Sequence, residues 1–129
     1  MRTSIHCYPT VEAMQHLDQV RGKFVQIKWK QAPWLLLASK DQHAFHNQIL
    51  AHFLSEQHLP FHWHSPERLE FDVPEMEIVG GGKFLLDWSA SSLTLSDNSM
   101  VYGRFDEAML GESLRHVGMP WAGLSISIR

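Results

Sequence analysis

Cysteine is nearly absent from this sequence, because Cys7 is the only one among 129 residues. A single cysteine excludes an intrachain disulfide and a cysteine-rich metal framework. This fits a reducing compartment, and we expect a cytoplasmic protein. Cys7 lies in a strand-like segment, so we interpret it as a core residue rather than as a reactive thiol.

Long hydrophobic runs are also missing. The longest one, at residues 34–38, is far shorter than the roughly 20 residues that span a bilayer. The N-terminus lacks the basic region and apolar stretch of a signal peptide. We therefore expect neither a membrane segment nor a signal peptide.

Positive charge is sparse as well. The formal net charge is −3 with neutral histidines, and no dense stripe of lysine and arginine occurs. Binding to nucleic acid through its phosphates is therefore not expected. A basic pocket for one small anion stays open, because it requires only two or three cations.

The composition is otherwise that of an ordinary globular protein, with 44% hydrophobic and 19% charged residues. A chain of this length favours one core, so we expect a single domain over residues 1–129. Helical and strand-like segments follow one another in an irregular order. We therefore predict an α+β fold with a mixed, mostly antiparallel sheet flanked by helices, and no internal repeat.

Apolar spacing predicts most of the elements. The expected elements are a helix at 9–20, a strand at 23–30, a short strand near 68–71, a hairpin formed by 76–86 and 93–95, a helix at 106–117 and a closing strand at 124–129. Residues 34–38 fit either a buried strand or the approach to a helix.

The clearest helix is expected over residues 42–57. Phe45, Ile49 and Phe53 recur at fourfold spacing, and the segment Ser39-Lys40-Asp41 supplies a capping residue. This places His43 in the first turn, where free backbone N–H groups and the helix dipole bind phosphate. His46 follows one turn later. The alternative for both histidines is that they are exposed polar residues beside the apolar stripe.

Three glycines precede a lysine at residues 80–83. A Walker loop is excluded, because Glu77 stands where its first glycine belongs and Phe84 stands where it has serine or threonine. Consecutive glycines instead allow a bulge or a close approach of a ligand to the sheet, with Lys83 beside it.

Two other segments carry candidate groups. His62 and His64 fall on one side of an extended segment, and with Glu67 or His58 they offer a weak metal-site hypothesis. The turn Ser-Met-Val-Tyr-Gly at 99–103 offers a hydroxyl and several backbone amides to an anion.

Taken together, His43-Ala44, the segment 77–84 and the segment 99–103 followed by Glu107-Ala108 resemble the Janus/Ocnus family, which includes the phosphohistidine phosphatases. The resemblance runs from about residue 23 to residue 126. It implies a small α+β fold and an enzyme that removes phosphate from phosphohistidine without a metal or other cofactor.

The resemblance also implies roles for individual residues. In the family, a histidine that opens a helix carries the chemistry, and we assign that role to His43 as general base or nucleophile. The phosphate ligands implied are backbone amides at Gln42, His43, Ala44, Ser99 and Val101, together with Lys23 and Lys83. Lys23 is matched to a family lysine that opens the first strand.

The sequence departs from the family in having a longer connection at residues 59–73, and Lys40 is the only candidate for the family's upstream arginine. The partner implied is a phosphohistidine-containing protein or peptide, bound by a monomer. The alternative is a non-enzymatic protein of the same family that binds phosphate or a phosphoprotein.

Overall fold

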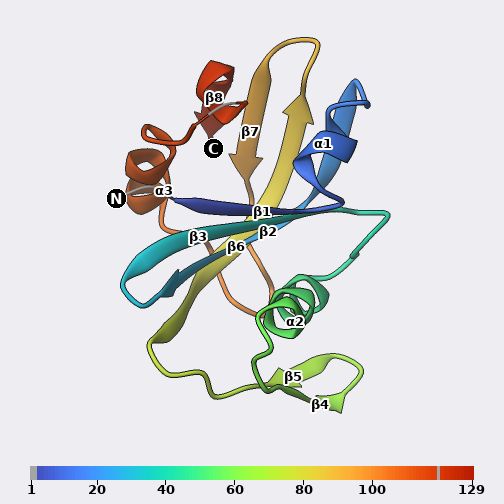
Figure 1. Cartoon of the computed structure of the whole chain (residues 1–129), viewed down its shortest axis with the longest axis vertical. Helices are drawn as coiled ribbons and strands as arrows, with labels where there is room; N and C mark the ends of the chain where they lie inside the picture. The colour runs from blue at the N-terminus through green and yellow to red at the C-terminus, as the bar shows by residue number, and fades with distance from the viewer. Residues whose placement is uncertain (1–2, 119) are drawn as a thin grey trace.

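A computed structural model describes residues 3–118 and 120–129 of the chain. Six strands form one sheet in the order β1-β3-β2-β6-β7-β8, and two more form a small sheet (Figure 1). The strands are β1 (Ser4–Tyr8), β2 (Gln19–Trp29), β3 (Ala32–Ser39), β4 (His62–Ser65), β5 (Arg68–Glu70), β6 (Met76–Asp87), β7 (Ser92–Ser96) and β8 (Ser125–Ile128). The helices are α1 (Val11–Met14), α2 (His46–Glu56) and α3 (Glu107–Leu114), followed by a 3-10 turn at Trp121–Gly123.

The main sheet is mixed and mostly antiparallel. The β2–β3, β2–β6 and β6–β7 pairs are antiparallel, whereas the two edge pairs, β1–β3 and β7–β8, are parallel. The predicted α+β fold is therefore confirmed.

Both faces of the sheet are buried, and helices cover each of them. In Figure 1, α2 lies against one face, and α1 and α3 lie on the other side. Alternation along the central strands divides the apolar side chains between the two cores, so that Phe24 and Leu37 join the α1/α3 core while Val25 and Leu36 join the α2 core. Lys23, two residues before Val25, therefore belongs to the α2 face of β2.

The first predicted helix is much shorter than expected. Thr10 caps it, with Oγ1 3.3 Å from the amide of Ala13, but α1 ends at Met14. Leu17 is exposed, and Val20 instead pairs with Leu86 inside β2. Strand β2 begins at Gln19, so the prediction that a strand opens at Lys23 is wrong.

The second predicted helix also begins later than expected. Residues 40–42 form a turn and residues 44–45 a bend, and the N-cap of α2 is Phe45 rather than a residue of the segment 39–41. The ambiguous run at 34–38 is a strand, buried within β3.

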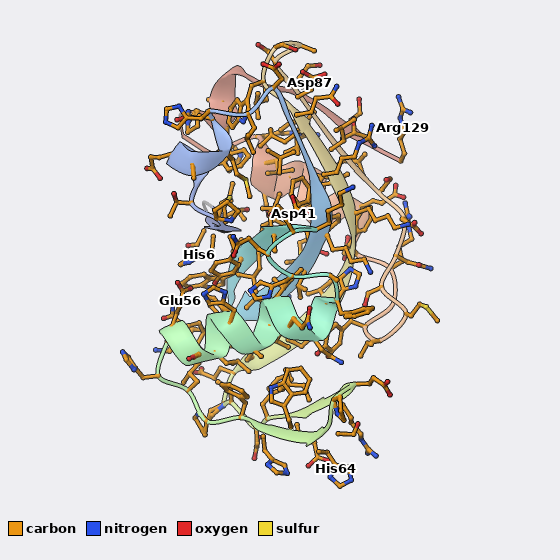
Figure 2. All side chains as sticks on the ribbon, turned by 90° about the vertical axis from the view of Figure 1, so that its right-hand side faces the viewer. His6, Asp41, Glu56, His64, Asp87 and Arg129 are labelled. Atoms are coloured by element: carbon orange, nitrogen blue, oxygen red, sulfur yellow. The ribbon has the colours of Figure 1, made fainter. Side chains whose placement is uncertain are left out.

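The remaining elements follow the prediction closely. Asp106 caps α3, accepting a 2.9 Å hydrogen bond from the amide of Met109. The β6–β7 hairpin and the closing strand β8 are present. The longer connection at 59–73 contains the β4–β5 hairpin, and Figure 2 shows α2 between this hairpin and the sheet. No helix among the described residues is long and apolar enough to cross a membrane.

Candidate functional site

The histidine that opens α2 is His46. Gln48, three residues after the N-cap, accepts hydrogen bonds from the amides of Ala44 (3.1 Å) and Phe45 (3.3 Å) and so fixes where the helix begins. The first helical amides, those of His46 and Asn47, have no acceptor within the helix. They lie at the positive end of the helix dipole, which attracts an anion.

The ring of His46 is held against the glycine triplet. Nε2 lies 3.0 Å from the carbonyl oxygen of Gly82, and only 6% of the residue is exposed. A carbonyl oxygen can only accept, so Nε2 carries the proton and Nδ1 keeps its lone pair. A Cβ at Gly81 would lie 2.9 Å from Cδ2 of His46, which explains why a glycine is needed there.

Nδ1 of His46 is the chemically available nitrogen. It has no hydrogen-bond partner among the described residues. The buried side-chain atoms that lack a partner are Thr3 Oγ1, Trp34 Nε1 and Trp88 Nε1, so Nδ1 is not sealed in the core. A basic nitrogen next to free helix amides is suited to act on a bound phosphoryl group.

Two lysines lie beside this imidazole. Lys23 in β2 and Lys83 in β6 are direct cross-strand partners. Nζ of Lys23 lies 5.3 Å from the centroid of the Phe45 ring, and Nζ of Lys83 lies 3.1 Å from a carboxylate oxygen of Asp97. Like charges placed opposite each other destabilise a sheet, and the carboxylate of Asp97 offsets part of this repulsion.

The turn at residues 99–103 forms the third part of the site. Ser99 and Gly103 exchange backbone hydrogen bonds of 3.0 and 2.8 Å, and the amide of Tyr102 donates to Oγ of Ser99 at 3.1 Å. Gly103 also accepts a 3.1 Å hydrogen bond from the amide of Gly81. In the described part of the chain, the amides of Met100 and Val101 have no intramolecular acceptor.

Asn47 connects this turn to the helix and to the β4–β5 hairpin. Its Oδ1 accepts a hydrogen bond from the hydroxyl of Tyr102, and its Nδ2 donates to the carbonyl oxygen of Glu67 at 2.7 Å. The side chain is buried. The longer connection at 59–73 is therefore tied directly to the second residue of α2.

The environment keeps His46 neutral. Burial lowers its pKa below the ordinary value, and the Gly82 carbonyl, which prefers a charged donor, opposes this. Lys23 and Lys83 lower the pKa further, whereas Asp97 raises it. A neutral imidazole at pH 7 is the form that can accept a proton or attack phosphorus.

His43 occupies a different setting. Its Nε2 lies 2.7 Å from Nδ1 of His52, and the ring of Tyr8 stacks on His52 with centroids 4.0 Å apart. Burial, and then His52, lower its pKa. The amides of Gln42 and His43 both donate to the carbonyl oxygen of Ser39 at 3.0 Å, so they are occupied.

The structure thus brings together only part of the predicted site. Lys23 and Lys83 face each other on β2 and β6, and the turn that contains Ser99 and Val101 is joined to α2 through Tyr102 and Asn47. The amides of Gln42, His43, Ala44 and Ser99 all make internal hydrogen bonds and are not free for phosphate. Placing His43 at the helix start is wrong, because Gln48 sets the start three residues later.

The metal-site hypothesis gains no third ligand. Figure 2 shows His64 on the hairpin, pointing away from the molecule. Its Nδ1 lies 3.5 Å from Glu70, and its ring centroid lies 6.4 Å from that of His62. Within residues 3–118 and 120–129, no three His, Cys, Asp or Glu side chains are placed to hold a metal ion.

Two hollows lie away from His46. One of about 390 Å³ separates α3 from β8 and is lined by apolar residues such as Leu114, Trp121 and Ile126. The other, of about 250 Å³, lies beside β1 and includes His6 and Glu56. Neither of these two hollows includes His46, Lys23 or Lys83.

No family model matches the chain, and no curated protein is significantly similar to it. The resemblance to the Janus/Ocnus family therefore stays a prediction that depends on the quoted motifs.

Proposed function

We propose that this protein is a phosphohistidine phosphatase and that His46 carries its chemistry. The observation behind the proposal is the imidazole of His46 at the first position of α2, fixed through Nε2 to Gly82, with Lys23 and Lys83 beside it. The family rule that a helix-opening histidine acts on phosphate then applies to His46 instead of His43.

The phosphoryl oxygens would bind to the free amides of α2 and of the turn at 99–103. Lys23 and Lys83 would offset the negative charge that is spread over these oxygens in the transition state. Preorganised N–H donors need no rearrangement at that moment. Asp97 keeps Lys83 in place through its 3.1 Å contact.

Nδ1 of His46 has two possible roles. As a general base it takes a proton from water, the water oxygen bonds to phosphorus, the phosphorus–nitrogen bond breaks, and the proton passes to the leaving imidazole. As a nucleophile Nδ1 bonds to phosphorus itself, the phosphorus–nitrogen bond of the substrate breaks, and the leaving imidazole takes a proton from solvent water; a water molecule then attacks phosphorus, releases phosphate and returns Nδ1 to its free form.

The main test is phosphate release from a phosphohistidine peptide, with a chelator present. The variants are His46→Gln, whose side-chain amide can still donate to Gly82, and His43→Gln as the matched control. Loss of an acid–base or nucleophilic group costs roughly 10²- to 10⁴-fold in rate. We expect that loss in His46→Gln and nearly full activity in His43→Gln. The reverse pattern would assign the chemistry to His43.

A second experiment separates the two roles. Rapid quenching in alkali should trap an acid-labile phosphoryl group on the wild-type protein if Nδ1 is the nucleophile. No such group should form in His46→Gln. Turnover without a trapped intermediate would favour the general-base role.

A binding protein is the second candidate, and the burial of His46 favours it. With only 6% of the residue exposed, an attacking water has little room at the ring. A phosphate-binding protein would bind a non-hydrolysable phosphonate analogue of phosphohistidine yet release no phosphate from the substrate.

A further inference from the structure

Large apolar side chains that are exposed gather beside His46. Four such residues occur in the described part of the chain, namely Leu17, Phe45, Met100 and Val101, and their exposed fractions are 52%, 62%, 100% and 59%. Phe45 directly precedes His46, and Met100 and Val101 form the tip of the turn that supplies free amides. Three of the four thus belong to the candidate site, and we call these three the apolar rim.

The backbone holds the rim in an exposed position. Phe45 is the N-cap of α2, and its amide donates to Gln48. The turn below Met100 and Val101 is closed by the two hydrogen bonds between Ser99 and Gly103. Both parts are anchored to the same core, since Gly103 accepts from Gly81. The apolar side chains of the rim are therefore exposed on segments that backbone hydrogen bonds hold in place.

The rim is larger than a phosphoryl group requires. Phosphate, or free phosphohistidine, is satisfied by the amides, by His46 and by the two lysines. Phe45 precedes His46 in the chain, and Met100 and Val101 lie in the turn that the hydrogen bond between Tyr102 and Asn47 joins to α2. Exposed apolar side chains grouped around a polar centre are typical of a surface that binds another molecule.

We propose that the apolar rim binds the apolar side chains that flank phosphohistidine in a peptide segment of the substrate protein. This proposal adds the flanking part of the substrate to the proposed function, and it depends on that function for the identity of phosphohistidine as the group bound at His46. A peptide with leucine-like residues next to phosphohistidine places its charge on the lysines and its side chains on Phe45 and Met100. The protein's net charge of −3 and the pairing of Lys83 with Asp97 suit one phosphoryl group better than an anionic bilayer.

The test compares a peptide that has leucines beside phosphohistidine, the same peptide with serines, and free phosphohistidine. The variants are Phe45→Ser and Met100→Ser, and Leu17→Ser is the matched control. Serine is a good N-cap residue, so Phe45→Ser keeps the start of α2. Met100 and Leu17 are exposed, so their replacement leaves the core intact.

We expect the rim variants to raise KM for the leucine peptide about tenfold more than they raise KM for the serine peptide or for free phosphohistidine, the signature of lost ground-state binding of the flanking side chains. Leu17→Ser should change KM for none of the three substrates. Equal effects on all three substrates, or equal affinity of the wild type for both peptides, would overturn the proposal. So would binding to phosphatidylserine vesicles that Met100→Ser abolishes.

A binding measurement keeps the two proposals distinguishable. A leucine-flanked peptide with a phosphonate analogue of phosphohistidine reports on the rim even if the protein releases no phosphate. Weaker binding by Phe45→Ser and Met100→Ser would support the rim without any turnover. Failure of free phosphohistidine to react would count only against the phosphatase.

Discussion

Nε2 of His46 lies 3.0 Å from the carbonyl oxygen of Gly82. This contact joins the first residue of α2 to the middle of β6 and fixes the tautomer of the ring. A substrate-facing group held by a helix and a strand is positioned more firmly than one on a loop. The glycine triplet and the histidine are thus two parts of one site, although 36 residues separate Gly82 from His46 in sequence.

Replacing Gly81 with alanine should disturb the ring of His46. The new Cβ would lie 2.6 Å from the carbonyl oxygen of Phe24 and 2.9 Å from Cδ2 of His46, so one of them must move. Overpacking of this kind typically costs about 1–3 kcal/mol. We expect urea denaturation to show that loss, together with a lower rate of phosphate release.

Gly111→Ala is the matched control for that substitution. Its Cβ would meet only Cδ1 of Ile128 at 3.7 Å, an ordinary contact, and Gly111 lies inside α3. Alanine favours a helix over glycine by up to about 1 kcal/mol. Stability should therefore be unchanged or higher, with normal activity. A Gly81→Ala protein as stable and active as this control would show that His46 does not need the glycine.

The pH dependence of the reaction should report on His46. Activity requires its neutral form, and burial lowers its pKa below the ordinary 6.5. The rate should therefore be more than half of its maximum at pH 6.5 and fall at lower pH, as the ring gains a proton. The check is kcat/KM as a function of pH, after subtraction of spontaneous hydrolysis. An inflection above pH 6.5 would contradict the assignment.

The start of α2 shows where local patterns mislead. Phe45 fits the fourfold spacing of Ile49 and Phe53, yet its side chain is exposed and only the later members of the stripe are buried. The useful signal was Gln48, because a glutamine at the third helical position often caps the preceding amides. Counting back from Gln48 would have placed His46 at the first helical position.

The elements were easier to predict where one face is buried, because the apolar residues then repeat with the period of the helix or strand. The β6–β7 hairpin, α3 and β8 repeat their apolar residues with the period of the element that they form. Val20 continues the three-residue spacing of Val11 and Met14, so the pattern predicts that the first helix extends to it. It belongs instead to β2, where it pairs with Leu86. Long-range pairing decides such cases, and a local pattern does not contain it.

Asn47 should act as a positioning residue for the turn at 99–103. Its buried side chain accepts from Tyr102 and donates to Glu67, so Asn47→Ala leaves both groups without a partner. Such a loss costs about 1–3 kcal/mol. We expect lower kcat as well as lower stability, because the free amides of Met100 and Val101 shift relative to His46.

A double-mutant cycle with Tyr102→Phe checks this coupling. Tyr102→Phe removes only the hydroxyl, so in the Asn47→Ala background it should cost much less than in the wild type. Additive effects on stability and on kcat would show that the contact between Asn47 and Tyr102 does not position the turn.

Lys23→Gln should separate function from stability. The substitution removes the repulsion between Lys23 and Lys83, and this change stabilises the folded protein. It also removes the contact of Lys23 with the Phe45 ring, and this change destabilises the protein, so the two effects largely cancel. We expect the free energy of unfolding to change by less than about 0.5 kcal/mol.

Phosphate binding should nevertheless weaken severalfold, and more at low salt than at high salt, because exposed charges are screened by ions. Lys28→Gln, on the same strand, is the control: it loses an opposite-charge pair with Glu77, so it should lower stability by about 0.2–1 kcal/mol and leave phosphate binding unchanged. If Lys23→Gln binds phosphate as tightly as Lys28→Gln does, the cationic pair is not part of the anion site.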